Sequence, residues 1–166
     1  MEMNFIAILV AAVVPTIVGF IWYNPKVFGT VWMQESGVTE EKMKNANMAK
    51  IFTLSFIFSF IFAMGATQLV IHQNHFHSVV MEEPGYGEAG SEMQNYVDDF
   101  MTKYGDNFRT FKHGMAHGFF SGIFILLPII ATNALFERRS WKYIFINLGY
   151  WVVTLMIVGG IVCGWH

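Results

Sequence analysis

The sequence predicts an all-α integral membrane protein, a four-helix bundle with one interfacial helix and one amphipathic cap helix. Composition is the first reason, because 54% of the 166 residues are hydrophobic and only 13% are charged, whereas soluble domains carry about 25% charged residues. The second reason is that four stretches contain no Asp, Glu, Lys or Arg. Each is about as long as the 20 or so residues that cross a hydrocarbon core. Backbone groups in lipid must satisfy one another, so each stretch should be a helix.

The first span is expected at residues 4–23 and the second at residues 51–71. Pro15 lies in the middle of the first span. It should kink that helix and free a carbonyl group that a neighbouring helix must satisfy. Apolar residues then recur at helical spacing through residues 25–35, which predicts a short helix lying along the membrane interface.

The only sizeable polar segment covers residues 72–112, between the second and third spans. Apolar side chains recur there at three- and four-residue spacing over 93–104, which predicts an amphipathic helix. Ser91 with Gln94 is the expected capping box at its start, and Gly105 is the expected stop. The acidic polar face of this helix argues against attraction to anionic lipid. We therefore expect the helix to cap the ends of the bundle.

The third and fourth spans, residues 113–136 and 143–165, are joined by a short charged turn and should form a helical hairpin. Pro128 should kink the third span as Pro15 kinks the first. All four spans and the polar segment belong to one domain, residues 1–166. Small residues let membrane helices approach closely. The glycines expected at such contacts are Gly114, Gly118, Gly122, Gly160 and Gly164.

The distribution of Lys and Arg predicts the orientation of the spans. The loops after the first and third spans hold seven of these residues, and the opposite side holds three. Because positively charged loops stay in the cytoplasm, we expect both termini and the polar segment 72–112 to lie outside. Net charge is −2, so no basic surface invites nucleic acid.

Three segments carry a resemblance to a known family: Gly19 to Trp32 (GxxWYxPxxFGxxW), Pro128 to Arg139, and Ile146 to Trp165 with its INxGY start. In combination they resemble the bacterial four-span membrane family catalogued as domain of unknown function 1761. The resemblance covers the first, third and fourth spans with their turns. It implies a multi-pass protein of the bacterial cytoplasmic (inner) membrane, and it brings no catalytic mechanism with it.

Histidines on the predicted outer side form the sharpest candidate site, and imidazoles at their spacing are typical ligands of zinc or copper. They are His72, His75, His77, His113 and His117. If the second and third spans are neighbours, the rings of His72, His113 and His117 can converge at the outer mouth, and water or a carboxylate from the acidic cap can complete a zinc site. Haem would need two histidines facing each other across the bundle. The alternative to any metal is a solvated or hydrogen-bonded interfacial cluster.

A second constellation should gather at the cytoplasmic ends of the first, third and fourth spans, where it could form a polar ligand-binding pocket. Its members are Trp22, Tyr23, Asn24, Asn133, Glu137, Arg139 and Asn147. The competing interpretation is structural, since Asn side chains cross-link membrane helices, acidic and basic neighbours pair, and Trp anchors the interface.

No span contains an ionisable Asp, Glu, Lys or Arg, which argues against an autonomous proton antiporter. No catalytic triad, nucleotide loop or paired intramembrane carboxylates indicate an enzyme, so the sequence favours a non-enzymatic protein. In the first interpretation it works through helix contacts, with lipid around it and with itself or other membrane proteins as partners. In the second it binds or transports a small ligand or metal ion through the histidine cluster.

Overall fold

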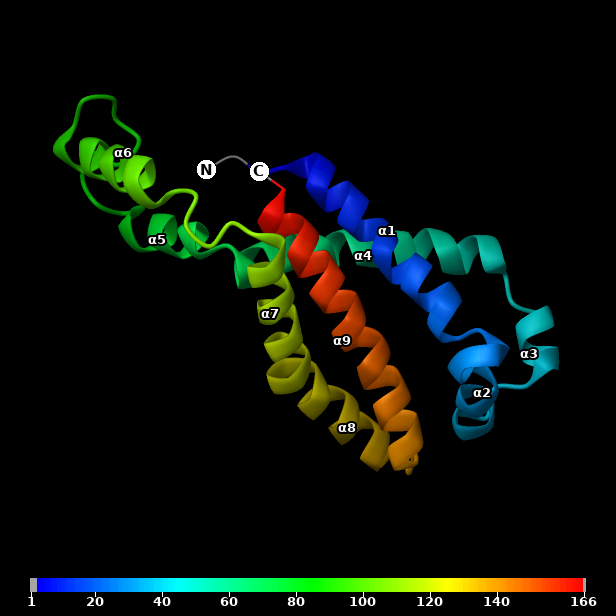
Figure 1. Cartoon of the computed structure of the whole chain (residues 1–166). Coiled ribbons are helices and arrows are strands. Elements are labelled where there is room, and N and C mark those ends of the chain that lie inside the picture. Colours follow the sequence, from blue (N-terminus) through cyan, green and yellow to red (C-terminus); the bar gives the residue numbers. More distant parts are fainter. Residues whose placement is uncertain (1–2, 166) are drawn as a thin grey trace.

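A computed structural model describes residues 3–165, and all regular elements in that range are helical (Figure 1). Four helical stretches are long and apolar enough to cross a membrane. They are α1 (Phe5–Trp22), α4 (Met48–Val70), α7 (Phe111–Ser121) continued by α8 (Leu127–Phe136), and α9 (Trp141–Gly164). The prediction of an all-α protein with four membrane-capable helices is confirmed.

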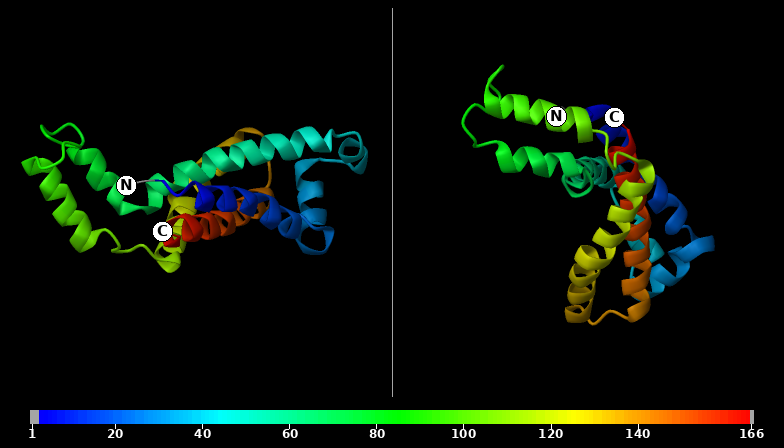
Figure 2. Two further views of the ribbon diagram at one scale, coloured as in Figure 1. Left: turned by 90° about the horizontal axis from the view of Figure 1, so that it is seen from above. Right: turned by 60° about the vertical axis from the view of Figure 1, so that its left-hand side comes forward.

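Shorter helices connect the long ones: α2 (Thr30–Ser36), α3 (Glu40–Lys44), α5 (His72–Val80) and α6 (Glu92–Tyr104). The expected interfacial helix is present as a π-helical turn, Pro25–Gly29, followed by α2. Gly37 ends α2 in the left-handed region, at φ 70°, which glycine adopts at no steric cost. Figure 2 shows α2 and α3 at one end of the molecule and α5 and α6 extending from the other.

The core lies where α1, α4 and α9 meet. Small and β-branched residues fill it, among them Ile8 and Ala11 from α1, Ala63 from α4, and Val158 and Cys163 from α9. Between apolar helices in lipid, such close packing supplies most of the attraction. α9 touches each of the other three long elements, whereas α4 crosses behind α1 and α9 at an angle (Figure 1).

The two prolines are accommodated differently. Pro15 lies within a continuous α1, and the Tyr150 hydroxyl of α9 donates to the carbonyl of Pro15 itself at 2.9 Å. The neighbour's bond therefore does not go to Ala11, whose carbonyl the proline ring leaves without its usual donor. Pro128 sits in the first turn of α8, directly after a π-helical turn at Gly122–Leu126. Such a wide turn is a common cause of a bend in a helix.

Glycines bring the backbones of α7 and α9 into contact. A Cβ placed on Gly114 would lie 2.1 Å from the Gly159 carbonyl oxygen, and one on Gly118 would lie 2.3 Å from that of Leu155. Gly122 faces Val152, with 2.7 Å between a Cβ and the valine Cγ2. Further along α9, Gly160 and Gly164 both pack against Phe111, the first against its ring and the second against its backbone.

The polar segment contains one helix that the sequence pattern did not indicate. Ile71 is extended, at φ −104° and ψ 102°, and this residue separates α4 from α5. α6 is the predicted amphipathic helix, and it packs on α5 through the stacked rings of Phe76 and Phe100, 3.9 Å apart. The Ser91 hydroxyl caps α6 by accepting from the Gln94 N–H. The Gln94 side chain accepts from Gly87 N–H, so the capping box is only half formed.

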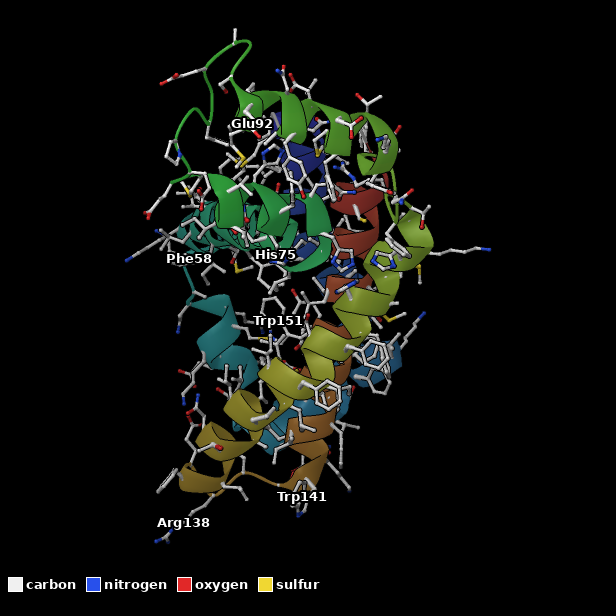
Figure 3. All side chains as sticks on the ribbon, turned by 90° about the vertical axis from the view of Figure 1, so that its left-hand side faces the viewer. Phe58, His75, Glu92, Arg138, Trp141 and Trp151 are labelled. Carbon is white, nitrogen blue, oxygen red and sulfur yellow. The ribbon has the colours of Figure 1, made fainter. Side chains whose placement is uncertain are left out.

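The start of α1 and the end of α9 lie at the same end of the long helices, since the Asn4 amide donates to the Trp165 carbonyl at 3.3 Å. This end also carries His72, the first residue of α5, and the start of α7, and we call it the histidine end; Figure 3 labels His75 of α5 near it. The opposite end carries the turn between α8 and α9, with Arg139, and we call it the arginine end. α5 and α6 lie beyond the histidine end, to one side (Figure 1).

Candidate metal-binding site

The break at Ile71 and the start of α7 place three histidines together. His72 is the first residue of α5, immediately after the extended Ile71. His113 and His117 are one turn apart on α7, whose start is fixed because the Thr110 hydroxyl accepts from the His113 N–H at 3.2 Å. α4 and α7 are in contact, which is the neighbour relationship that the convergence of these rings requires.

The three rings meet through their Nε2 atoms. The Nε2 atom of His113 is 2.9 Å from that of His72 and 3.0 Å from that of His117. One ligand atom from each of the three lies within 4.8 Å of the others. His72 is exposed and the other two are half-buried. Zn–N bonds of about 2.0–2.1 Å imply about 3.3 Å between nitrogens of a tetrahedral site. Small ring rotations would therefore fit the cluster around one ion.

No carboxylate or thiolate of residues 3–165 joins the cluster. Cys163 is the nearest thiol candidate by position, but it is buried and directed to the carbonyl oxygens of Phe108 and Val70, at 3.4 and 3.6 Å. Phe108 contacts the rings of His72 and His113, with centroids 5.8 and 5.0 Å away. The site is thus three imidazoles beside an aromatic ring, and water or an external group would supply the fourth ligand of a zinc ion.

The remaining two candidate histidines lie apart from this cluster. His77 Nδ1 is 3.0 Å from the Tyr86 hydroxyl, on the far side of α5, and burial lowers the pKa of His77 below its ordinary value. His75 lies on the next turn of α5 after His72 and is exposed (Figure 3). The predicted five-histidine set therefore divides into three and two. Since the three rings of the cluster touch one another, no two of them leave between them a space that a haem could fill.

Three residues of the second predicted constellation connect two helices through hydrogen bonds. The Trp22 indole donates to the Ile146 carbonyl and the Tyr23 hydroxyl to Asn147 Oδ1, both at 2.9 Å. Asn147 donates in turn to the Tyr143 carbonyl. These bonds join the end of α1 to α9, which is the cross-linking role that polar side chains have in membrane helices.

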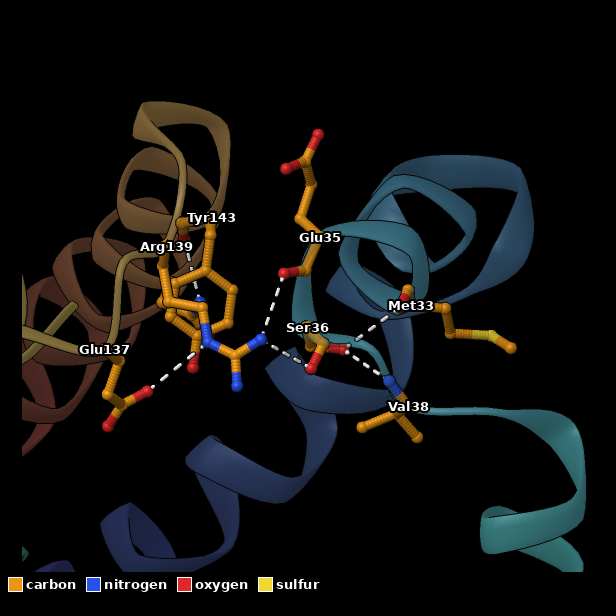
Figure 4. A network of polar contacts seen from close by, with 8 residues as sticks. Met33, Glu35, Ser36, Val38, Glu137, Arg139 and Tyr143 are labelled. Carbon is orange, nitrogen blue, oxygen red and sulfur yellow. Dashed lines mark hydrogen bonds and ion pairs between the residues drawn. The ribbon is translucent and has the colours of Figure 1, made fainter. Parts of the chain in front are cut away.

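Arg139 makes a separate network at the arginine end (Figure 4). Its Nη1 donates to the carbonyl oxygens of Ser36, at 2.9 Å, and Glu35, at 3.4 Å. Its Nε bonds Glu137 at 3.4 Å, and its guanidinium lies 5.5 Å from the centre of the Tyr143 ring. Helix ends leave carbonyl groups without partners. Arg139 donates hydrogen bonds to two such carbonyl groups at the end of α2.

The other two members of that constellation have different surroundings. Asn24 caps the turn after α1 by accepting from the Lys26 N–H at 2.9 Å. Asn133 is exposed on α8. Of the seven predicted residues, only Tyr23 and Asn24 line the cavity of about 730 Å³ between α1 and α4.

Sequence reasoning missed several residues that shape the histidine end. Thr110 is a helix-capping residue by type and directly precedes α7. It could therefore have indicated that the helix starts before residue 113. Gln73 is buried, and its amide donates to the carbonyl oxygens of Tyr104 and Asn107, which ties α5 to the end of α6. Gln73 carries no pattern that would have identified it.

By length and composition, the four long apolar helices are those of a membrane helix bundle. The chain belongs to the family described as Protein of unknown function (DUF1761), whose model matches residues 6–163. No curated protein and no solved structure matches the chain.

Proposed function

We propose that the protein binds a transition-metal ion, zinc or copper, through His72, His113 and His117. The observation that carries the proposal is the pair of short Nε2 contacts, 2.9 and 3.0 Å, that both end on the Nε2 atom of His113. A neutral ring nitrogen carries either one proton or one lone pair. It can therefore make a good hydrogen bond to only one of the two neighbours. A cation that accepts a lone pair from each ring satisfies all three.

The type of ligand atom limits which metal ions the site can bind. Imidazole nitrogen suits zinc, copper, iron and nickel, whereas magnesium and calcium prefer oxygen ligands. Three protein ligands and one open position are the arrangement of zinc sites that exchange a water or a substrate group. The surrounding segment attracts cations, because residues 72–112 contain seven Asp or Glu and three Lys or Arg.

The test is metal content by mass spectrometry on protein purified without a His-tag. Near-stoichiometric zinc or copper is expected in the wild-type protein and should be lost in the double variant His113→Ala/His117→Ala. His75→Ala is the matched control, since His75 is an exposed histidine of α5, the helix of His72, and lies outside the cluster. Metal-free wild-type protein that takes up no added zinc or copper would leave a hydrogen-bonded interfacial cluster as the correct description.

Action through helix contacts is the second candidate function. It is supported by the uneven burial of the four spans: 11% of the residues in the apolar windows of α4 and of α7–α8 are buried, against 39% in α1 and 44% in α9. The outward faces of these elements are open to lipid, to a second copy or to another membrane protein. Mass measurement in lipid nanodiscs distinguishes a monomer from a homo-oligomer, and co-purification without crosslinking identifies other partners.

Location in the cytoplasmic membrane, with both termini outside, completes the proposal. It is supported by the position of the basic residues. Lys26, the α3 lysines and Arg139 belong to the connections at the arginine end. The positive-inside rule assigns that end to the cytoplasm, which leaves the histidine site facing outward.

A further inference from the structure

A cavity of about 730 Å³ lies between α1 and α4, where α9 forms its inner wall. Its volume falls in the range of about 300–1,000 Å³ that is typical of small-molecule sites. The two tyrosines in its wall, Tyr23 and Tyr150, have hydroxyls that already donate to Asn147 and to the Pro15 carbonyl. These two bonds hold the tyrosine side chains in place, so hydrogen bonds to a ligand would have to come from other groups in the cavity wall.

The chemistry of the lining excludes a charged ligand group. No Asp, Glu, Lys, Arg or His is among the lining residues, and a charge without a partner in an apolar site is costly. Aromatic rings are abundant instead, from both helices and from α9: Phe20, Phe52, Phe58, Phe62 and Trp151. Flat molecules gain most from such walls, because stacked and edge-to-face ring contacts add to the effect of burial.

Three hydroxyl groups on the cavity wall have no hydrogen-bond partner among the residues that the structure describes. Thr16 of α1 and Ser55 and Ser59 of α4 line the cavity, and none of these side chains makes a hydrogen bond to residues 3–165. Ser59 is only 8% exposed. Elsewhere in α4, Thr67 donates to the carbonyl of Met64 at 2.7 Å, so the helix does provide local acceptors. A hydroxyl without a partner in an apolar environment costs free energy, and a ligand with acceptor atoms would remove that cost.

The cavity also opens toward the membrane. Phe20 and Phe58, which both line it, remain 63% exposed each, on helices whose outer faces meet lipid. Entry from the bilayer therefore requires a lipid-soluble molecule. Ser55 and Ser59 are one turn apart on the same face of α4, whereas Thr16 belongs to α1, so hydrogen-bond donors come from two different walls.

From these features we propose that the cavity binds a flat, neutral, lipid-soluble carbonyl compound of the quinone class. The hydroxyls of Thr16, Ser55 and Ser59 donate to its carbonyl oxygens, and the aromatic side chains pack on its ring. The proposal concerns binding alone and is independent of the histidine site, since no residue is shared between the cavity and the histidine cluster. A phospholipid acyl chain is the competing occupant, and it offers no acceptor to the hydroxyls.

The experiment uses the full chain in lipid nanodiscs and a decyl-substituted benzoquinone as the probe. Saturable quenching of tryptophan fluorescence is expected, with Trp151 as the reporter inside the cavity. Decylbenzene, which has the same tail and a ring without carbonyl groups, should bind much more weakly when it competes with the probe. Equal binding of the two compounds would reduce the site to an apolar cavity and overturn the proposal.

Variants of the hydroxyls give the second readout. Ser55→Ala/Ser59→Ala removes two donors and should weaken quinone binding roughly tenfold or more. Ser121→Ala is the control, because Ser121 is a span serine of α7 that does not line the cavity. Ser59→Phe should fill the cavity and abolish saturable quenching, while the thermal midpoint shows whether the variant is folded. Unchanged quinone affinity in the folded Ser59 variants, or recovery of tightly held phospholipid in place of the probe, would refute the assignment.

Discussion

His72 and His113, 41 residues apart in the sequence, meet with their Nε2 atoms 2.9 Å apart. The contact joins the first residue of α5 to α7 at the histidine end. A metal ion bound there should stabilise the folded protein, since a ligand at 100 times its Kd contributes about 2.7 kcal/mol. We expect added zinc to raise the Tm of the tag-free wild-type protein by several degrees.

The zinc effect should disappear in His113→Ala and survive in His75→Ala, and a chelator should reverse it in the wild-type protein. Thermal unfolding in detergent, followed by circular dichroism, measures all of these. A rise in Tm of equal size in His113→Ala would show that zinc acts elsewhere on the protein.

Gly118 tests the contact between α7 and α9. In Gly118→Ala the new Cβ would lie 2.3 Å from the Leu155 carbonyl oxygen, so the two backbones must separate. We expect a loss of about 1–3 kcal/mol or more, as for other overpacked interiors. Gly65→Ala is the matched control, because nothing lies within 4 Å of a Cβ there. The control should leave the thermal midpoint unchanged or raise it slightly, and equal midpoints for the two variants would contradict the close packing.

Arg139 joins the turn before α9 to the end of α2, so its removal should loosen that end of the molecule. Arg139→Ala leaves the carbonyl oxygens of Glu35 and Ser36 without this donor, at a cost of about 1–3 kcal/mol. Arg139→Lys should recover only part of it, because lysine lacks the planar fork of donors. Hydrogen exchange should rise in residues 30–44.

The neighbouring Arg138 provides the control for Arg139. It is exposed and carries the same charge, so Arg138→Ala should leave the exchange of residues 30–44 as in the wild-type protein. An equal loss of protection in both variants would show that charge in the turn, and not the bonds to α2, holds the two elements together.

The four spans were predictable from the sequence because lipid imposes a simple condition, a charge-free helical stretch, that needs no knowledge of neighbours. Local capping chemistry was also predictable, because it depends only on residues close together in the sequence. Ser91 and Gly37 are examples. The end of α4 at Ile71 agrees with the predicted second span, residues 51–71, whereas the separate helix α5 that begins at His72 was not predicted.

The candidate site was likewise predictable from the sequence only in part. The spacing of His113 and His117 fixed two rings on one face of a helix, but the arrival of His72 required α4 and α7 to be neighbours, which is a tertiary relationship. Its place directly after the second span distinguished His72 from His75 and His77, which lie further along the polar segment. At the arginine end, residue type indicated polar contacts but could not tell a ligand pocket from cross-links such as the bond between Tyr23 and Asn147.

His77 makes the packing of the loop after α5 sensitive to pH. Burial lowers the pKa of His77 below the ordinary value of about 6.5, and its Nε2 atom is buried with no partner among the described residues. The folded state thus favours the neutral ring, so its contribution to stability is complete above the unfolded pKa and is lost as pH falls below it. Hydrogen exchange around Tyr86 should increase between pH 7.5 and pH 5.5. His77→Gln should remove this pH dependence, and a variant with the wild-type profile would assign the effect to another group.

Cysteine accessibility tests the orientation of the spans. The only native cysteine, Cys163, is buried, so a single introduced cysteine reports its own position. Lys44→Cys lies on exposed α3 near the arginine end, and Glu88→Cys lies in the exposed loop before α6. With seven basic residues in the loops of the arginine end and three on the other side, the positive-inside rule assigns the former to the cytoplasm. In whole cells, an impermeant maleimide should label Glu88→Cys and should reach Lys44→Cys only after the membrane is permeabilised. Labelling of Lys44→Cys in intact cells, with Glu88→Cys protected, would place the histidine site in the cytoplasm and reverse the proposed topology.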